Sequence, residues 1–149
     1  MIKLRKLNSR IVYFIILLFT ASCNDMRKFH HQSYIAVTHN DVLLRVMNGE
    51  DITKLTTTGH SDIPRLISGG MDMEVFVIWV DPNAYLPVGA FERANALIDA
   101  LENVEKLIPD KLEIVRTFDD LQKIENAGKL AAFIGVEGGH PIVKAAWKN

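Results

Sequence analysis

Short apolar runs alternate with amphipathic stretches along most of the chain. The runs that are continuously apolar or rich in β-branched residues have the pattern of buried strands, and they occupy residues 34–38, 75–80, 113–116 and 129–136. Apolar positions spaced by three and four residues predict a long helix over residues 91–108, which Pro109 ends. Shorter helices are predicted over residues 42–47 and 118–127, with Gly128 capping the latter.

The segments between these elements are polar and contain glycine or proline. Residues 51–67 are interrupted by Gly59 and Pro64, so we expect a long loop there, and we expect another loop over residues 81–87. Strands that alternate with helices predict a parallel α/β architecture. A chain of 149 residues is long enough for one domain at most.

The N-terminal segment has the layout of a secretory signal. Residues 1–10 carry basic but no acidic side chains, residues 11–19 are apolar, and small residues precede Cys23. We therefore predict a signal peptide of the lipoprotein type over residues 1–22, with Cys23 lipidated, although Thr20 stands where such signals usually carry leucine. An ordinary cleaved signal peptide and a buried strand are the alternatives. The prediction implies a mildly acidic protein, lipid-anchored on the outer side of a bacterial cell membrane, with one domain over residues 23–149.

Composition and charge exclude several classes of protein. A content of 48% hydrophobic and 23% charged residues argues against a disordered chain. The formal net charge is −1, and no basic cluster occurs beyond the leader, so we expect no binding to nucleic acid. A single cysteine excludes an internal disulfide and a cysteine-rich zinc module.

Residues able to bind a metal follow two of the predicted strands. His39 and Asp41 come at the end of the first, and Glu137 and His140 come at the end of the last. Residues two apart in a strand point to the same side, and parallel strands place their carboxyl ends together, so His39, Asp41 and Glu137 could bind one ion. The alternative is that the first two merely end a strand, with Asp41 capping the helix that follows.

Three strings of residues together resemble a known family. They are THND at residues 38–41, GHSDIPRL at residues 59–66, and IGVEGGH at residues 134–140. In this order they resemble the membrane (renal) dipeptidase family of zinc peptidases, over residues 34–141. The resemblance implies a (β/α)8 TIM-type barrel of the metal-dependent hydrolase type that cleaves dipeptides with two zinc ions. It assigns His39 and Asp41 as ligands of one zinc and Glu137 as the catalytic carboxylate that bridges both, and it gives His140 no ligand role.

The chain departs from the family in its length. The family takes the histidines of its second zinc, and the residues that grip the substrate, from later strands, whereas this sequence ends at Asn149. We therefore expect the N-terminal half of a barrel, a truncated and inactive piece, and we assign no substrate-binding residue. Its open sheet edges would favour aggregation or a homodimer. The alternatives are a non-catalytic lipid-anchored envelope protein that keeps half of the fold, and an amidohydrolase acting on a non-peptide substrate.

Overall fold

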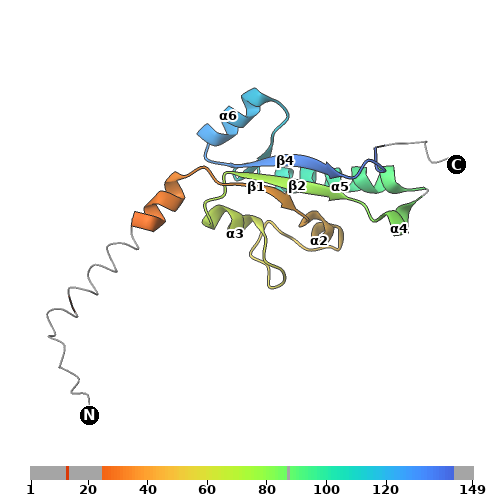
Figure 1. The fold of residues 1–149 in the computed structure, drawn as a ribbon, viewed down its shortest axis with the longest axis horizontal. Helices are drawn as coiled ribbons and strands as arrows, with labels where there is room; N and C mark the ends of the chain where they lie inside the picture. The colour runs from red at the N-terminus through yellow and green to blue at the C-terminus, as the bar shows by residue number, and fades with distance from the viewer. Residues whose placement is uncertain (1–12, 14–24, 87, 143–149) are drawn as a thin grey trace, which may run out of the picture. The chain divides into compact units, whose positions relative to one another are not determined.

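The computed structural model describes Tyr13, residues 25–86 and residues 88–142, in two separate units (Figure 1). The first unit is Met1–Tyr34, in which residues 25–32 are helical, and the second is Ile35–Asn149. Cys23 and most of the predicted leader lie outside the described residues. Within the described part of the chain, no helix has the length and apolar character needed to cross a bilayer.

The second unit is a parallel α/β structure, as the alternating pattern predicts. Its elements are β1 (Ala36–Asn40), α2 (Leu43–Met47), α3 (Ile63–Ser68), β2 (Met73–Trp79), α4 (Pro82–Tyr85), α5 (Ala90–Leu107), β3 (Leu112–Ile114), α6 (Phe118–Asn126) and β4 (Leu130–Glu137). The four strands form one sheet in the order β1-β2-β4-β3, and every neighbouring pair is parallel.

The strand order differs from the sequential order of a simple (β/α)8 barrel. β4 pairs with β2 along seven residues, from Met73 opposite Ala131 to Trp79 opposite Glu137, whereas the short β3 pairs only with the beginning of β4. The chain between β2 and β4 is therefore an excursion through α5, β3 and α6. In Figure 1, α6 lies beyond β4 while α2 and α3 lie on the side of β1. As a result, the carboxyl ends of β1, β2 and β4 meet at one end of the sheet.

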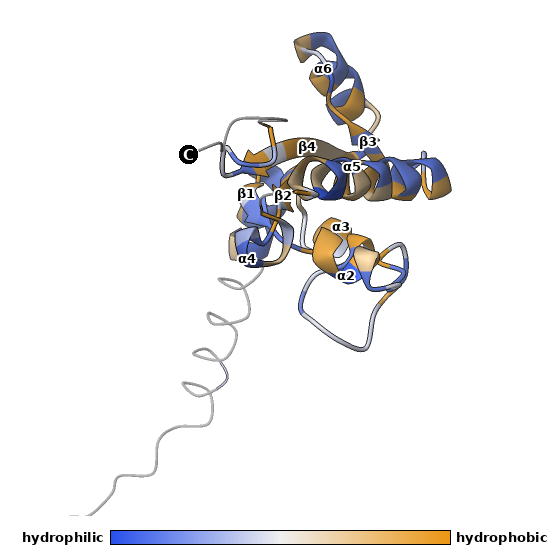
Figure 2. Ribbon diagram, turned by 90° about the vertical axis from the view of Figure 1, so that its right-hand side faces the viewer, coloured by the Kyte–Doolittle hydropathy of each residue, from blue (hydrophilic) through white to orange (hydrophobic). Residues whose placement is uncertain are grey.

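The core lies between one face of the sheet and α5. Alternate residues of β2, Phe76 and Ile78, are fully buried together with Leu97 and Leu101 of α5. α5 carries both hydrophobic and hydrophilic residues, as an amphipathic helix should (Figure 2).

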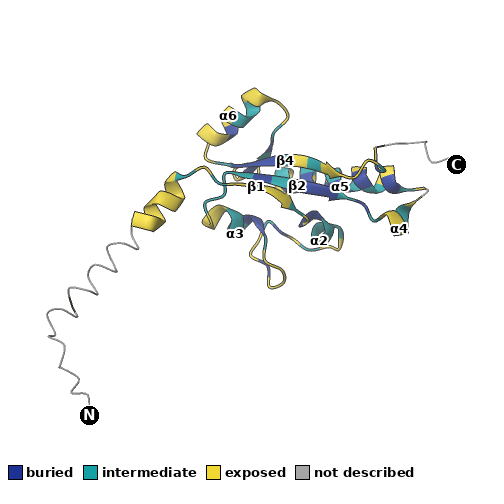
Figure 3. Cartoon of the chain, viewed as in Figure 1, coloured by how far each residue is buried: buried dark blue, intermediate teal, exposed yellow. Residues whose placement is uncertain are grey.

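Burial of the strands differs from two of our expectations (Figure 3). β1 contains no buried residue, so the prediction of a buried strand at residues 34–38 is wrong in burial and shifted from the observed bounds. β1 is an edge strand, so fewer neighbours cover it. An open half-barrel would also leave strand residues such as Ile35, Val77 and Ile134 exposed. Ile134 is 38% exposed, whereas Val77, on the interior strand β2, is only 3% exposed.

Two helices lie where we predicted only loops. The Asp62 side chain accepts a hydrogen bond from the Arg65 backbone at 2.9 Å and starts α3, whose first turn contains Pro64. Asp81 caps α4 in the same way, accepting from the Asn83 backbone. Proline is tolerated in the first turn of a helix, where its missing N–H group has no helical partner. It therefore marks a helix start at both places rather than a break.

Candidate metal centre

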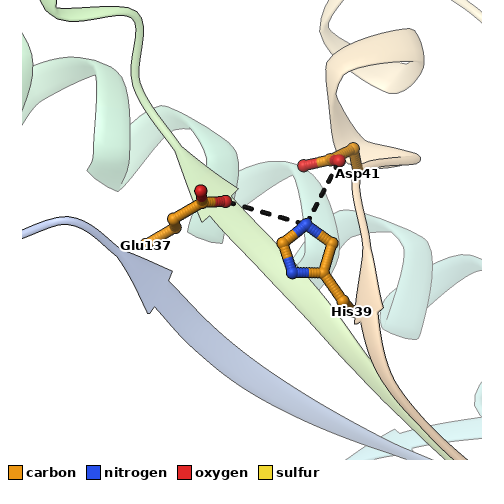
Figure 4. Close-up of side chains that lie close together, drawn as sticks. All are labelled: His39, Asp41 and Glu137. Atoms are coloured by element: carbon orange, nitrogen blue, oxygen red, sulfur yellow. Dashed lines mark ion pairs between the residues drawn. The ribbon is translucent and has the colours of Figure 1, made fainter.

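Three side chains converge at the carboxyl ends of β1 and β4 (Figure 4). His39 Nε2 lies 3.3 Å from Asp41 Oδ2 and 3.7 Å from Glu137 Oε2. The three potential ligand atoms all lie within 4.8 Å of one another, and within the described ranges no other group of three His, Cys, Asp or Glu residues is so arranged. The structure thus brings together the three residues predicted from the sequence as metal ligands.

A β-bulge in β1 directs His39 to this cluster. Val37 is opposite Glu74 and Asn40 is opposite Phe76, so three steps along β1 match two steps along β2. The extra residue changes which side chains of β1 face the core. Asn40 therefore lies on the same face as Phe76, and His39 lies on the opposite face. Without the bulge, His39 would stand opposite Phe76 and point toward the core.

Asp41 is free to face His39 because a neighbouring side chain serves the backbone at this turn. The Asn40 carboxamide oxygen accepts a hydrogen bond from the Val42 backbone at 3.0 Å. Val42 is the N-cap of α2 and makes no side-chain capping bond, and the described contacts of Asp41 include none from its side chain to α2. The structure therefore gives no support to the alternative that Asp41 is a helix cap.

Glu137 is placed by the end of β4 and the loop after it. Its strand partner is Trp79 of β2, and Gly138 follows with a φ of +82°, which lets the chain turn away directly after the carboxylate. His140 Nε2 then lies 2.9 Å from the Val80 carbonyl oxygen, which can only accept a hydrogen bond, so the ring donates. His140 therefore ties the loop to the end of β2 and is not part of the three-residue cluster.

The donor set suits a divalent cation. The side chains of His39, Asp41 and Glu137 are 56%, 51% and 49% exposed, so an ion can reach them from solvent. Within the described residues, neither carboxylate pairs with a lysine or arginine, although the two point at the same imidazole nitrogen. A neutral imidazole and two carboxylates are ordinary zinc ligands, and their two negative charges balance a divalent ion. The residues present therefore fit a metal.

Sequence analysis assigned no role to the polar residues behind the cluster, although Asn40 and Ser61 belong to two of the strings that resemble the dipeptidase family. Asn40 Nδ2 donates to Ser61 Oγ at 2.8 Å, which joins β1 to the loop before α3. Glu74 of β2 is completely buried on the face that Asn40 shares. The available signal was a single acidic residue directly before the apolar run at residues 75–80.

Known proteins resemble this chain in sequence and in fold. The chain is 27% identical over 95 residues to "Dipeptidase tcpJ" of Claviceps purpurea (strain 20.1), covering 56% of this chain and 21% of that protein. A crystal structure of a metallopeptidase described as "dipeptidase AC" superposes with a TM-score of 0.61 at 25% identity, covering 72% of this chain and 36% of that one.

A Rhodobacter sphaeroides metallopeptidase, liganded with a phosphinate mimic of the dipeptide L-Ala-D-Ala, gives a TM-score of 0.62 at 22% identity, over 72% of this chain and 39% of its own. At that identity the likeness shows the fold alone. This chain thus spans well under half the length of these relatives. The α/β fold class, part of a metal-hydrolase barrel, is confirmed. The membrane dipeptidase family, peptidase family M19, matches residues 23–147, and the chain therefore belongs to that family.

Proposed function

We propose that the protein is a metal-dependent dipeptidase in which His39, Asp41 and Glu137 hold zinc. The observation that carries the proposal is the convergence of their ligand atoms at the carboxyl ends of two strands. Active sites of parallel barrels occupy this end. Family membership supports dipeptide hydrolysis, and the dipeptide mimic bound by a protein of the same fold supports a dipeptide as substrate.

Each ligand has a role set by its chemistry. His39 offers Nε2 of the neutral imidazole, and Asp41 offers a carboxylate oxygen from the same strand end. Glu137 directs Oε2 at His39, while its other oxygen points away (Figure 4) and is available to a second ion. We propose that the complete site would hold two zinc ions and that Glu137 would contribute carboxylate oxygens to both. Bound zinc supplies positive charge that polarises a carbonyl group and acidifies a water molecule.

The surrounding residues hold these groups in place. The bulge in β1 keeps His39 on the face opposite the core, and His140 keeps the chain after Glu137 against the end of β2. Ligands fixed by strands are held more precisely than ligands on mobile loops. We also propose that the protein is lipid-anchored through Cys23 on the outer side of a bacterial membrane, because the leader has the layout of a lipoprotein signal.

The proposal is tested by removing one charge from the site. Glu137→Gln keeps the size of the side chain but replaces a carboxylate by a neutral amide with one good acceptor oxygen. We expect this chain to bind Zn²⁺ in a calorimetric titration, and Glu137→Gln to weaken binding by at least about tenfold. In an assay of dipeptide hydrolysis with the protein as the cell makes it, we expect Glu137→Gln to abolish nearly all activity.

Glu125→Gln is the matched control, because Glu125 lies exposed on α6, away from the cluster. It should bind zinc and hydrolyse dipeptides like the unaltered protein. Unchanged zinc affinity and activity in Glu137→Gln would contradict the proposal.

A further inference from the structure

Glu74 is an acidic residue enclosed in the core of the sheet. Its side chain is fully buried, and neither of its oxygens makes a hydrogen bond of ordinary geometry to a described residue. It shares a face of β2 with the buried side chains of Phe76 and Ile78. Burial raises the pKa of the Glu74 carboxyl, because the apolar surroundings disfavour its charged form. A carboxyl group buried in this way lowers the folding stability of the core unless a hydrogen-bonding partner compensates for the lost water.

The Asn40 carboxamide is the polar group that stabilises the charged form of Glu74. The Asn40 side chain lowers the pKa of Glu74, although burial outweighs this effect. The same carboxamide accepts from the Val42 backbone at 3.0 Å and donates through Nδ2 to Ser61 Oγ at 2.8 Å. An amide nitrogen carries two hydrogens, so Asn40 retains one donor after serving Ser61. Glu74 shares this face of the sheet and is the group whose pKa the Asn40 side chain lowers.

Asn40 lies between His39 and Asp41, the two proposed metal ligands at the carboxyl end of β1. It lies on the core face while His39 lies on the opposite face, and its bond to Val42 closes the turn that contains Asp41. Rotation of the Asn40 carboxamide would break this bond and release the turn. Whatever orients the carboxamide therefore helps to hold the backbone turn from which Asp41 projects.

We propose that Glu74 is a positioning residue for the metal centre: its buried carboxyl holds the Asn40 carboxamide, which in turn sets His39 and Asp41 for one ion. This inference rests on the proposed function, because it takes His39 and Asp41 to be metal ligands. Partners behind metal ligands commonly orient the ligands and are needed for full affinity.

A positioning role and a merely structural role predict different results for Glu74→Met. Methionine fills a similar space without a polar group, so it removes the cost of burying a carboxyl group. The positioning role predicts that the variant is as stable as the unaltered chain or more stable, yet binds Zn²⁺ more weakly by roughly tenfold. A structural role predicts that folding stability and metal affinity change in the same direction or that affinity does not change.

The experiment measures urea unfolding midpoints and Zn²⁺ dissociation constants for the unaltered chain and its variants. Glu74→Gln retains an acceptor oxygen for Asn40 and should bind Zn²⁺ within about twofold of the unaltered chain. Asn40→Ala should lose affinity at least as much as Glu74→Met, and it keeps the test decisive if the latter does not fold. Ile78→Val is the control, because it removes one buried methylene group from the same face of β2. It should lower the unfolding midpoint and leave zinc affinity unchanged.

Two results would overturn the inference, and they differ from failure of the proposed function. If the unaltered chain binds Zn²⁺ and Glu74→Met and Asn40→Ala bind it equally well, the positioning role is wrong while the metal centre stands. If Glu74→Gln loses as much affinity as Glu74→Met, the acceptor role is wrong. If the unaltered chain binds no Zn²⁺, the proposed function and the inference fall together.

Discussion

At the scale of single residues, Arg45 organises the loop that reaches the metal centre. Its guanidinium group donates to both carboxylate oxygens of Glu50, at 2.7 and 2.6 Å, and to the backbone carbonyl groups of Thr58 and Ser61. Ser61 in turn accepts the hydrogen bond from Asn40. The hydrogen bonds of this one arginine therefore hold the segment between α2 and α3 close to the metal centre.

The Arg45–Glu50 pair should make folding stability depend on acidic pH. Hydrogen bonding to Arg45 is the main cause that lowers the pKa of Glu50 from 4.5 to about 2. A lowered pKa in the folded state stabilises the fold above the unfolded value of 4.5, and this contribution is lost as the pH falls toward 2. Urea unfolding midpoints measured from pH 6 to pH 2 should fall less steeply for Glu50→Gln than for the unaltered chain. Parallel curves would show that the pair does not couple to folding.

Gly135 of β4 lies where the neighbouring strand leaves no room for a larger side chain. A Cβ atom at this position would lie 2.6 Å from Cγ1 of Val75 on the neighbouring strand. We expect Gly135→Ala to lower the free energy of unfolding by about 1–3 kcal/mol, measured by urea denaturation. Gly139→Ala is the control, because nothing lies within 4 Å of its added Cβ. Adding Val75→Ala should restore part of the lost stability, and failure to do so would point away from this clash.

At the scale of elements, α6 depends on a capping box. Thr117 Oγ1 accepts from the Asp120 backbone at 3.2 Å, and Asp120 Oδ2 accepts from the Thr117 backbone at 2.9 Å. Each bond serves a backbone N–H group that has no partner within the helix. Because α6 has a single fully buried residue, Ile124, its stability relies on such local bonds more than that of α5 does.

We expect Thr117→Ala to lower the free energy of unfolding by about 1 kcal/mol. Amide hydrogen exchange should become faster in α6, from residue 118 to residue 126, and stay unchanged in α5. Thr57→Ala, at an exposed loop position, should change neither quantity. An effect spread evenly over both helices would mean that α6 does not open separately from the core.

The pattern of apolar residues predicted long helices more accurately than short ones, because a longer helix repeats the pattern over more turns. α5 begins and ends within one residue of its predicted bounds, because its apolar spacing extends over several turns before Pro109. α3 and α4 are too short for such a repeat, and their starting signals, Asp62 and Asp81 before a proline, resemble turn signals. A cap followed by proline is therefore a better guide to short helices than proline alone.

At the scale of the whole molecule, the predicted lipid anchor at Cys23 would place the protein on the outer side of a bacterial membrane. Cys23 lies outside the described residues, so the lipoprotein interpretation remains a prediction from the leader. If Cys23 is lipidated, Cys23→Ser should release the protein from the membrane fraction of bacterial cells or block its processing, seen as a change in fractionation or mass. Glu125→Gln, fractionated in parallel, should stay with the membrane. An unchanged mass and membrane fraction in Cys23→Ser would contradict the prediction.

The sequence by itself determined the parallel α/β class, the family, and the identity of the three residues that the structure brings together. Strand-end position and spacing carry this information, because side chains two apart in a strand share a face and parallel strands end together.

Only the tertiary structure decided how these residues are held. The bulge that directs His39 depends on pairing between β1 and β2, and the adjacency of β2 and β4 depends on an excursion of the chain that no local pattern specifies. Likewise, Glu74 and Asn40 are distant in sequence and share a face only because that register aligns them. The interaction that we infer between them depends on strand pairing, so neither segment specifies it alone.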